Sequence, residues 1–453
     1  MQTPIYDFVQ NYIQSDDARF HMPGHKGVPF LGCEPGDITE IEGADVLYTP
    51  SGIIEQSEKN ATMLFQTAHT FYSTEGSSLA IRAMLAMARE TSDSRQPLVL
   101  AARNAHKAFV YACALLDLRV QWLYSDRAHH VCTGVITPCE LRMALEKLNE
   151  MPMAVYVTSP DYLGNVCDIA GLSSVCDAYG IPLLVDNAHG AYLGFLEPSL
   201  HPIALGASLC CDSAHKTLPV LTGGAYLHVS KKAPEHYLKN ARKYLSLFAS
   251  TSPSYLILQS LDLCNAYLAR GYRERLSECI RRVIDVKKHI AQRGFCMVDG
   301  EPLKIVIDAK KSGFEGTELA QLLRAQGVQC EFSDPDFLVL MATPENRTVD
   351  FERLKAAFNA ITPREPLDGG VEPVRNPEIV LDLRRAVLAP SETVFVDDAV
   401  GRICASPTVA CPPAVPIVIS GERITEAHVR AMKYYGHKTI EVVKESFLTA
   451  QEL

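Results

Sequence analysis

Ser213-Ala214-His215-Lys216-Thr217-Leu218-Pro219-Val220-Leu221-Thr222-Gly223-Gly224 is the stretch from which the fold of this chain can be worked out. An apolar run broken by small residues, 203–211, precedes it and predicts a buried strand. The stretch itself contains proline and glycine and predicts a loop. This loop presents the amine of Lys216 among hydroxyl groups, with His215 as its neighbour. A lysine placed in this way is a candidate nucleophile.

A second strand end lies upstream, at Leu183-Leu184-Val185-Asp186-Asn187-Ala188-His189-Gly190. An aspartate after one strand and a lysine after a later strand are what a site for pyridoxal phosphate (PLP) requires. The carboxylate keeps the pyridine nitrogen of the cofactor protonated, and the lysine holds the cofactor covalently. The two strand ends therefore predict a PLP site built on Asp186 and Lys216.

Short apolar strands alternate with helices from Leu98 onward, which predicts an α/β fold with a mainly parallel sheet. Ligands of such sheets bind beyond the carboxyl ends of the strands. The predicted strands are 98–101, 120–123, 154–158, 183–186, 209–212 and 226–229, and the predicted helices between them are 105–116, 139–149 and 170–179. Polar clusters follow four of these strands, at 104–107, 158–162, 186–189 and 213–216.

Three other segments allow two interpretations each. Gly76-Ser77-Ser78 opens an apolar helix, so it is either an anion site or an ordinary N-cap. The loop 21–27, His-Met-Pro-Gly-His-Lys-Gly, is either a surface connection or a segment that closes over a site. The Ser-Thr-Ser-Pro-Ser interruption at 250–254 either caps a helix or reaches the cofactor phosphate of a neighbouring subunit.

Composition narrows the class of protein. The 453 residues are 47% hydrophobic and 21% charged, and the net charge of -10 argues against nucleic-acid binding. Fourteen cysteines are scattered without zinc-ligand spacing, so no metal site is predicted. The chain shows neither a signal-peptide pattern nor an apolar run long enough to span a membrane. We therefore expect a cytoplasmic protein with reduced, mostly buried thiols.

Taken together, the motifs resemble the fold-type-I PLP-dependent ornithine/lysine/arginine decarboxylases in their compact form, close to the biosynthetic arginine decarboxylases. The likeness runs through nearly the whole chain. It is carried by 21–27, 45–52, 76–78, 104–107, 186–190, 213–224, 250–262 and a terminal proline-rich run with Gly421-Glu422. It implies a large PLP-binding domain of the aspartate aminotransferase fold with an N-terminal segment (1–270), a small α/β domain (271–364) and a C-terminal α+β decarboxylase domain (365–453).

The resemblance also implies roles for individual residues. Lys216 is expected to carry PLP and Asp186 to pair with the pyridine nitrogen, while His106 stacks on one face of the ring and Ala188 lies against the other. The remaining residues implied for cofactor binding are Gly76, Ser77, Ser78, His189, Ser213 and His215. The family works as a dimer or a higher even oligomer with shared active sites, which makes Thr251 and Ser252 candidates for contact with the cofactor of the other subunit.

Two departures from the family pattern stand out. Glu75 replaces the asparagine that often precedes the Gly-Ser/Thr of the phosphate loop, and we expect its carboxylate to point away from a phosphate. The family's Tyr-Pro-Pro-Gly-Ile-Pro is here Cys411-Pro412-Pro413-Ala414-Val415-Pro416, which removes the tyrosine as a substrate contact.

The expected reaction is decarboxylation of a basic amino acid, with arginine favoured and lysine or ornithine possible. Lys216 or His215 would return a proton to the product. The alternatives are another PLP reaction, such as aldol cleavage or elimination, and a non-catalytic PLP-binding paralogue that regulates polyamine synthesis. A carboxylate must recognise the basic side chain, and Glu331, Asp334 and Asp336 are candidates, although a solvated turn is the favoured interpretation for each. His129-His130 is interpreted as an exposed loop.

Overall fold

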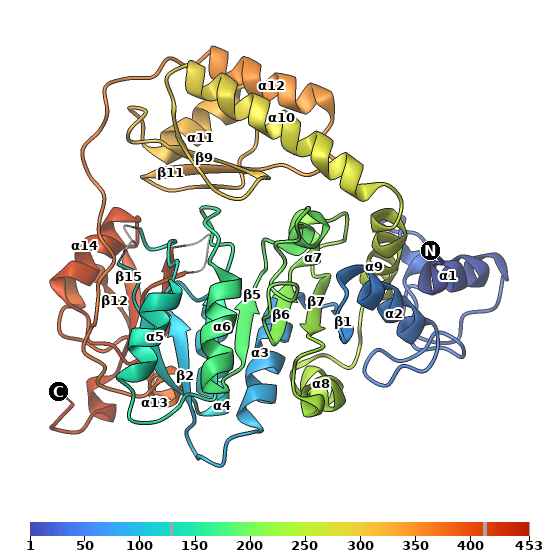
Figure 1. Ribbon diagram of the computed structural model, residues 1–453, viewed down its shortest axis with the longest axis horizontal. Helices are drawn as coiled ribbons and strands as arrows, with labels where there is room; N and C mark the ends of the chain where they lie inside the picture. The colour runs from blue at the N-terminus through green and yellow to red at the C-terminus, as the bar shows by residue number, and fades with distance from the viewer. Residues whose placement is uncertain (127–129, 411–414, 453) are drawn as a thin grey trace. The chain divides into compact units, whose positions relative to one another are not determined.

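The main sheet contains all six strands predicted from the sequence. The computed structural model describes residues 1–126, 130–410 and 415–452. Its largest sheet has the strand order β1-β7-β6-β5-β4-β2-β3 (Figure 1). The strands are β1 (His69–Ser73), β2 (Leu98–Ala102), β3 (Arg119–Leu123), β4 (Ala154–Thr158), β5 (Leu183–Asp186), β6 (Leu209–Asp212) and β7 (Ala225–Val229). β2 pairs with β3 and β5 with β6 in parallel, whereas β7 runs antiparallel to β1 and β6.

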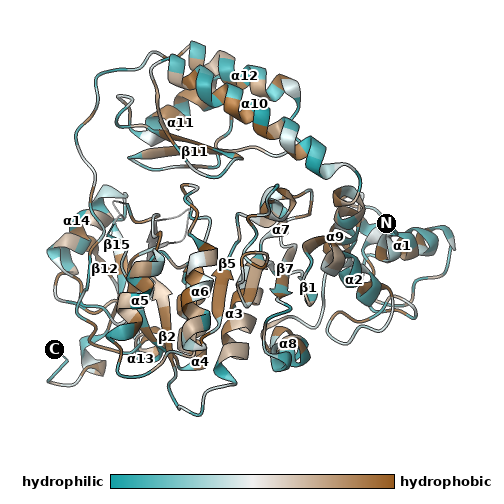
Figure 2. Cartoon of the chain, in the orientation of Figure 1, coloured by the Kyte–Doolittle hydropathy of each residue, from teal (hydrophilic) through white to brown (hydrophobic). Residues whose placement is uncertain are grey.

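Figure 2 shows β5, at the centre of this sheet, as predominantly hydrophobic. All four residues of β5 and all four of β6 are buried, as expected for strands covered on both faces. The α/β fold with a mostly parallel sheet is therefore confirmed. The sequence prediction missed β1, whose sequence His-Thr-Phe-Tyr-Ser lacks a clear apolar alternation.

The chain divides into two compact units. The first comprises Met1–Asp93, Met153–Tyr156 and Ile169–Arg275, and the second Ser94–Pro152, Val157–Asp168 and Leu276–Leu453. The division into three domains expected from the sequence stays a prediction.

The first unit contains most of the helices that precede or follow β1, β5, β6 and β7 along the chain. They are α1 (Pro4–Gln14), α2 (Ile53–Phe65), α3 (Gly76–Arg89), α6 (Ile169–Tyr179), α7 (Ala214–Thr217), α8 (Glu235–Phe248) and α9 (Tyr255–Leu268), with the short 3₁₀ turns η1 (Glu34–Gly36) and η2 (Ala191–Phe195). α1, α2 and α9 pack against one another (Figure 1). The buried Asp262 carboxylate of α9 accepts the backbone N–H groups of Ile5 and Tyr6 and so caps α1.

The second unit contains a four-stranded sheet of order β10-β11-β9-β8 and two small two-stranded sheets, β12-β15 and β13-β14. Figure 1 shows α10, α11 and α12 on one face of the four-stranded sheet. Its remaining elements are α4 (Lys107–Leu116), α5 (Pro138–Glu146), α10 (Tyr272–Gln292), β8 (Cys296–Val298), β9 (Lys304–Asp308), α11 (Gly316–Ala325), β10 (Phe332–Ser333), β11 (Phe337–Met341), α12 (Thr348–Asn359), α13 (Leu383–Leu388), β12 (Ser391–Phe395), η3 (Val396–Asp398), β13 (Thr408–Ala410), β14 (Val415–Val418), α14 (Glu426–Tyr434), β15 (Thr439–Val443) and η4 (Glu445–Phe447).

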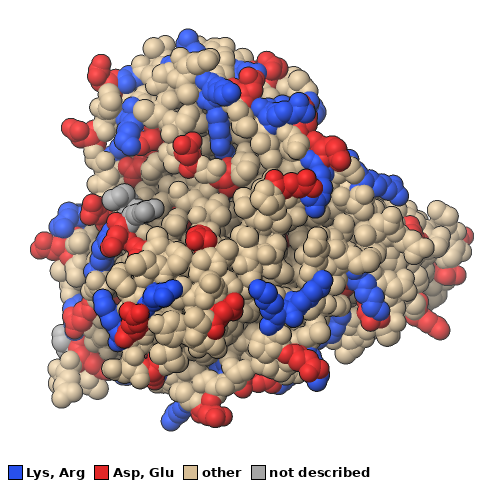
Figure 3. All heavy atoms as spheres, viewed as in Figure 1, with Lys and Arg blue, Asp and Glu red and all other residues tan. Residues whose placement is uncertain are grey.

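Surface charge is mixed on the face drawn in Figure 3, where basic and acidic side chains are interspersed. Among the described residues, no helix combines the length and the apolar character needed to cross a bilayer.

One buried histidine of the second unit makes stability depend on pH. His428 lies in the first turn of α14, where its ring nitrogen Nδ1 accepts the N–H of Thr425. Burial and the nearby charge of Arg103 lower the pKa of His428 to about 4. An unfolded histidine has a pKa of about 6.5, so the folded state binds fewer protons between these values. The stability contribution is therefore complete above about pH 6.5 and is lost as the pH falls toward 4.

We predict that His428→Gln weakens this acid sensitivity, because glutamine at the third helical position keeps the capping box without titrating. Between pH 7 and pH 5, wild type should lose about 2 kcal/mol more unfolding free energy than the variant. Urea unfolding at both pH values measures this. His289→Gln, at a partly exposed site on α10, serves as the control. An equal loss in wild type and His428→Gln would contradict the prediction.

Candidate active site

The ends of β5 and β6 lie side by side because the parallel register pairs Asp186 with Cys211. The Asp186 carboxylate is buried and faces donors. Its Oδ1 accepts the N–H of Ala188 at 3.1 Å and the thiol of Cys211 at 3.6 Å, and its Oδ2 accepts the hydroxyl of Tyr156 at 3.2 Å. Three donors therefore hold this carboxylate in place at the end of β5.

Lys216 lies in α7, a helix of one turn that directly follows β6. Its Nζ is 3.1 Å from Nε2 of His189, which lies three residues after Asp186. The neighbouring His215 contacts the carbonyl oxygen of Gly224 through Nδ1 at 2.9 Å, and burial lowers the pKa of His215. The Lys216 amine, His189 and His215 thus all lie just beyond the ends of β5 and β6. The lowered pKa favours the neutral form of His215 at pH 7.

The predicted anion site forms at the start of α3. Gly76 has a φ of +71°, a conformation that favours glycine, and its N–H donates to the carbonyl of Gly223 at 2.7 Å. Ser213 Oγ donates to Ser77 Oγ at 2.8 Å, so hydroxyls far apart in the sequence meet at a helix N-terminus. Ser78 follows in the same first turn. Backbone N–H groups, hydroxyls and a helix dipole together suit a phosphate group.

Glu75, immediately before this helix, has its carboxylate occupied elsewhere. Its Oε1 accepts the backbone N–H of Ser250 at 2.7 Å. The interaction connects the start of α3 to the loop that carries Thr251 and Ser252, both of which are exposed. Their predicted contact with a second subunit stays a prediction.

Asp212, the last residue of β6, is the centre of a buried network that the sequence analysis did not identify. Its Oδ2 accepts the ring nitrogens of His201 and His228 at 3.0 and 3.1 Å, and its Oδ1 accepts the side-chain amide of Asn187 at 2.7 Å. Burial alone would raise the pKa of Asp212, but the two histidines outweigh it and hold the pKa well below its usual value. The network ties the residues after β5 to the end of β6.

His106 belongs to the second unit, where it forms the N-cap of α4 and its Nδ1 accepts the N–H of Ala108 at 3.1 Å. Its stacking on the cofactor ring stays a prediction. Residues 411–414 of the proline-rich run lie outside the described residues, as does His129.

The acidic loop before β11 differs from the solvated turn that was expected. Of its three acidic residues, Glu331 is exposed, while Asp334 and Asp336 are only 6% and 8% exposed. His130, interpreted as exposed, is also buried, with Nε2 2.8 Å from Asp334 Oδ2. The interpretation was therefore right for Glu331 and wrong for Asp334, Asp336 and His130, because a carboxylate can be buried when it has a partner.

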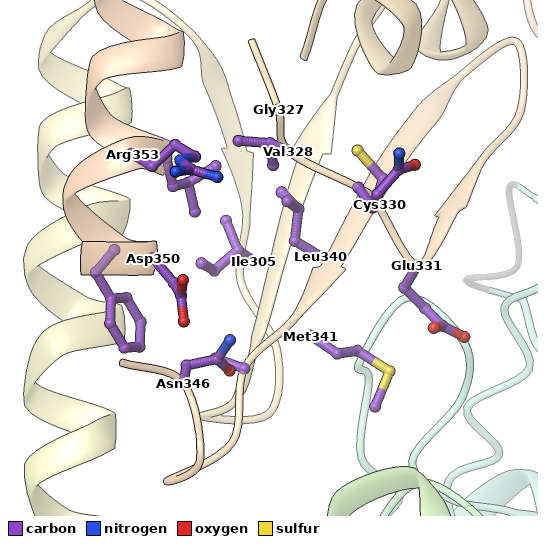
Figure 4. A pocket seen from close by; sticks show the side chains of 14 residues that line it. Ile305, Gly327, Val328, Cys330, Glu331, Leu340, Met341, Asn346, Asp350 and Arg353 are labelled. Atoms are coloured by element: carbon purple, nitrogen blue, oxygen red, sulfur yellow. The ribbon is translucent and has the colours of Figure 1, made fainter. Parts of the chain in front are cut away.

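Glu331 also borders a pocket of about 320 Å³ in the second unit (Figure 4). Ile305 and Leu340 line it with apolar side chains, and Asp350 and Arg353 approach it from α12. The Glu331 carboxylate accepts the hydroxyl of Tyr162 at 2.8 Å, which fixes its position at this pocket.

The first unit alone offers the principal groups that PLP requires. The amine of Lys216 is available for a covalent link, the donor-surrounded carboxylate of Asp186 suits a protonated ring nitrogen, and the Ser77–Ser213 hydroxyl pair at a helix N-terminus suits the phosphate. The chemistry of the residues present therefore fits this cofactor.

Comparisons with known proteins agree with this fit. A family model described as "Orn/Lys/Arg decarboxylase, major domain" matches residues 3–307, and the model of its C-terminal domain matches residues 375–447. Uncharacterized protein YaaO of Bacillus subtilis is 30% identical over 95% of this chain and 94% of its own length. Arginine decarboxylase of the same organism is 28% identical over 94% of this chain and 92% of its own.

A solved structure extends the likeness to the fold. The lysine decarboxylase LdcF of Francisella novicida superposes with a TM-score of 0.80 at 18% identity, covering 98% of this chain and 81% of that protein. This chain belongs to the Orn/Lys/Arg decarboxylase family and is a PLP-dependent amino-acid decarboxylase of fold type I.

Proposed function

We propose that the enzyme decarboxylates arginine, releasing CO₂ and the corresponding amine. The observation that carries the reaction class is the meeting of Lys216, His189 and Asp186 at two neighbouring strand ends. The preference for arginine is supported by relatives named arginine decarboxylase in Bacillus subtilis and Bacillus anthracis, which are 28% and 27% identical to this chain.

Each residue of the site has a separate task in this proposal. Lys216 would hold the cofactor covalently, and Asp186 would keep its ring nitrogen protonated. When bound, PLP supplies an electron-accepting ring for the pair left on Cα as CO₂ departs. His189, 3.1 Å from the Lys216 amine, can exchange a proton with it, so that the amine can return a proton to Cα. Ser77 and Ser213 anchor the phosphate.

Substrate choice is tested by incubating the purified holoenzyme separately with arginine, lysine and ornithine. We expect kcat/KM for arginine to exceed the other two by at least about ten-fold, a difference of ~1.4 kcal/mol in transition-state stabilisation. Released CO₂ and the identified amine are the readouts. A preference for lysine or ornithine would overturn the substrate, whereas aldehyde or ammonia as the product would overturn the reaction.

We also propose that the active form is a homodimer, working in the cytoplasm. The segment 20–31 exposes large apolar side chains, with Phe20 at 95% and Leu31 at 89% exposure. The segment is nevertheless ordered by protein contacts, since Glu34 accepts the backbone N–H groups of Phe30, Leu31 and Gly32. A fixed apolar surface of this kind favours burial against a second copy.

Sedimentation analysis at micromolar concentration measures the oligomeric state. We expect a dimer or a higher even oligomer, and we expect Phe20→Asp with Leu31→Asp to shift the protein toward monomer. The same substitution at the exposed Leu247 of α8 serves as the control. A wild-type monomer would contradict the proposal.

A further inference from the structure

Two buried side chains from the strands beside β5 donate to the carboxylate of Asp186. Tyr156 of β4 donates its hydroxyl to Oδ2 at 3.2 Å, and Cys211 of β6 donates its thiol to Oδ1 at 3.6 Å. We infer that Tyr156 and Cys211 are positioning residues, which hold the Asp186 carboxylate in one orientation for the ring nitrogen of PLP.

Both side chains act as donors here, because the oxygens of the Asp186 carboxylate accept both hydrogen bonds. Burial raises the pKa of the Cys211 thiol well above its usual value, which keeps the thiol protonated. Tyr156 is fully buried, and its hydroxyl is oriented toward Oδ2. Since the Ala188 N–H also donates to Oδ1, both carboxylate oxygens are fixed and the plane of the group cannot rotate freely.

Strand geometry explains why residue 211 has this role and residue 210 does not. Cys211 is the register partner of Asp186, so their side chains lie on the same face of the sheet. Successive residues of a strand point to opposite faces. The Cys210 thiol accordingly lies 3.6 Å from Oδ1 of Asp212 instead. The two adjacent cysteines therefore provide a matched pair, in which Cys211 donates to Asp186 and Cys210 to Asp212.

The inference predicts an effect on cofactor binding that depends on the ring nitrogen. Losing a hydrogen bond to a charged acceptor should weaken PLP binding about ten-fold for Tyr156→Phe, and about three-fold for Cys211→Ala because a thiol is a weaker donor. An analogue in which carbon replaces the ring nitrogen (1-deaza-PLP) cannot use Asp186 in this way. Its affinity should therefore be the same in wild type and in both variants.

The experiment titrates the full-length apoprotein with PLP and with 1-deaza-PLP and compares the two dissociation constants. We expect Tyr156→Phe and Cys211→Ala to reduce the preference for PLP by about ten-fold and three-fold. Cys210→Ala and Tyr226→Phe, at buried sites in the same sheet, should leave the preference unchanged. Cys211→Ser, which keeps a donor, should restore it. Cys211→Ala with Cys211→Ser remains a sufficient test should Tyr156→Phe fail to fold.

The inference rests on the proposed pairing of Asp186 with the ring nitrogen, and the same titration separates the two. Equal wild-type affinity for PLP and 1-deaza-PLP would overturn the pairing itself. A clear wild-type preference for PLP that the Tyr156 and Cys211 variants retain, or an equal loss of both cofactors in these variants, would overturn only the positioning role.

Discussion

Lys216→Ala should give a folded protein that is colourless and releases no measurable CO₂ from arginine. The amine of Lys216 is the group in the described site that can hold the cofactor covalently, and it lies 3.1 Å from His189, with which it can exchange a proton. Losing both tasks at once should lower kcat by at least about 10⁴-fold. The yellow absorbance near about 420 nm that a lysine-bound cofactor produces should disappear.

Three measurements on the same sample test this expectation. Absorbance reports the covalent link, protein mass after borohydride reduction locates it, and CO₂ release reports turnover. Lys231→Ala, at an exposed position just after β7, serves as the matched control and should behave as wild type. If the Lys216→Ala protein stays yellow and gains the mass of the cofactor on reduction, the covalent link is on another lysine. The assignment of the active site to Lys216 would then be wrong.

The strands and helices were largely predictable because the apolar runs at their centres are local signals. β2, β4, β5 and β6 begin at the predicted residues. The antiparallel pairing of β7 could not be predicted, since strand direction depends on which distant strand it meets. The partner of β7 on one side is β1, which lies far away in the sequence and pairs with β7 along its whole length. The four-residue helix α7 is too short to produce a helical period in the sequence.

The candidate site was predictable where its residues sit in local motifs. Asp186 ends the apolar strand β5, and Ser213 and Lys216 come shortly after β6, so their positions at the strand ends could be expected. The role of Asp212 was not predictable, because its partners His201 and His228 approach from a loop and from an antiparallel strand. Nothing local distinguishes a charge that pairs in the core from one that is solvated.

The same reason explains the errors on the acidic loop. Asp334 and Asp336 stand among serine and proline residues, a composition typical of an exposed turn. His130 lies far away in the sequence, and its buried ring next to Asp334 makes the burial of these charges tolerable. The composition of the loop alone therefore cannot predict that Asp334 and Asp336 are buried.

Asp186→Asn should retain the yellow cofactor and lose most of its activity, with kcat lowered by about 10³-fold. Asparagine keeps the shape of the side chain but carries no negative charge, so it cannot hold a proton on the ring nitrogen, and the ring then accepts electrons poorly. Its amide would also face the hydroxyl of Tyr156 and the N–H of Ala188, which both donate toward residue 186. At least one of these donors would lose its acceptor, which should weaken cofactor binding as well.

The decisive comparison again uses the analogue without the ring nitrogen. In wild type, replacing PLP by 1-deaza-PLP should lower the rate of CO₂ release about as much as Asp186→Asn does, and the two changes together should cost little more than either alone. This non-additivity is expected because both remove the same interaction. Asp177→Asn, at an exposed site on α6, should leave turnover unchanged. An Asp186→Asn enzyme with at least a third of wild-type turnover would show that this carboxylate does not control the charge of the ring, and fully additive effects would place the two changes in separate interactions.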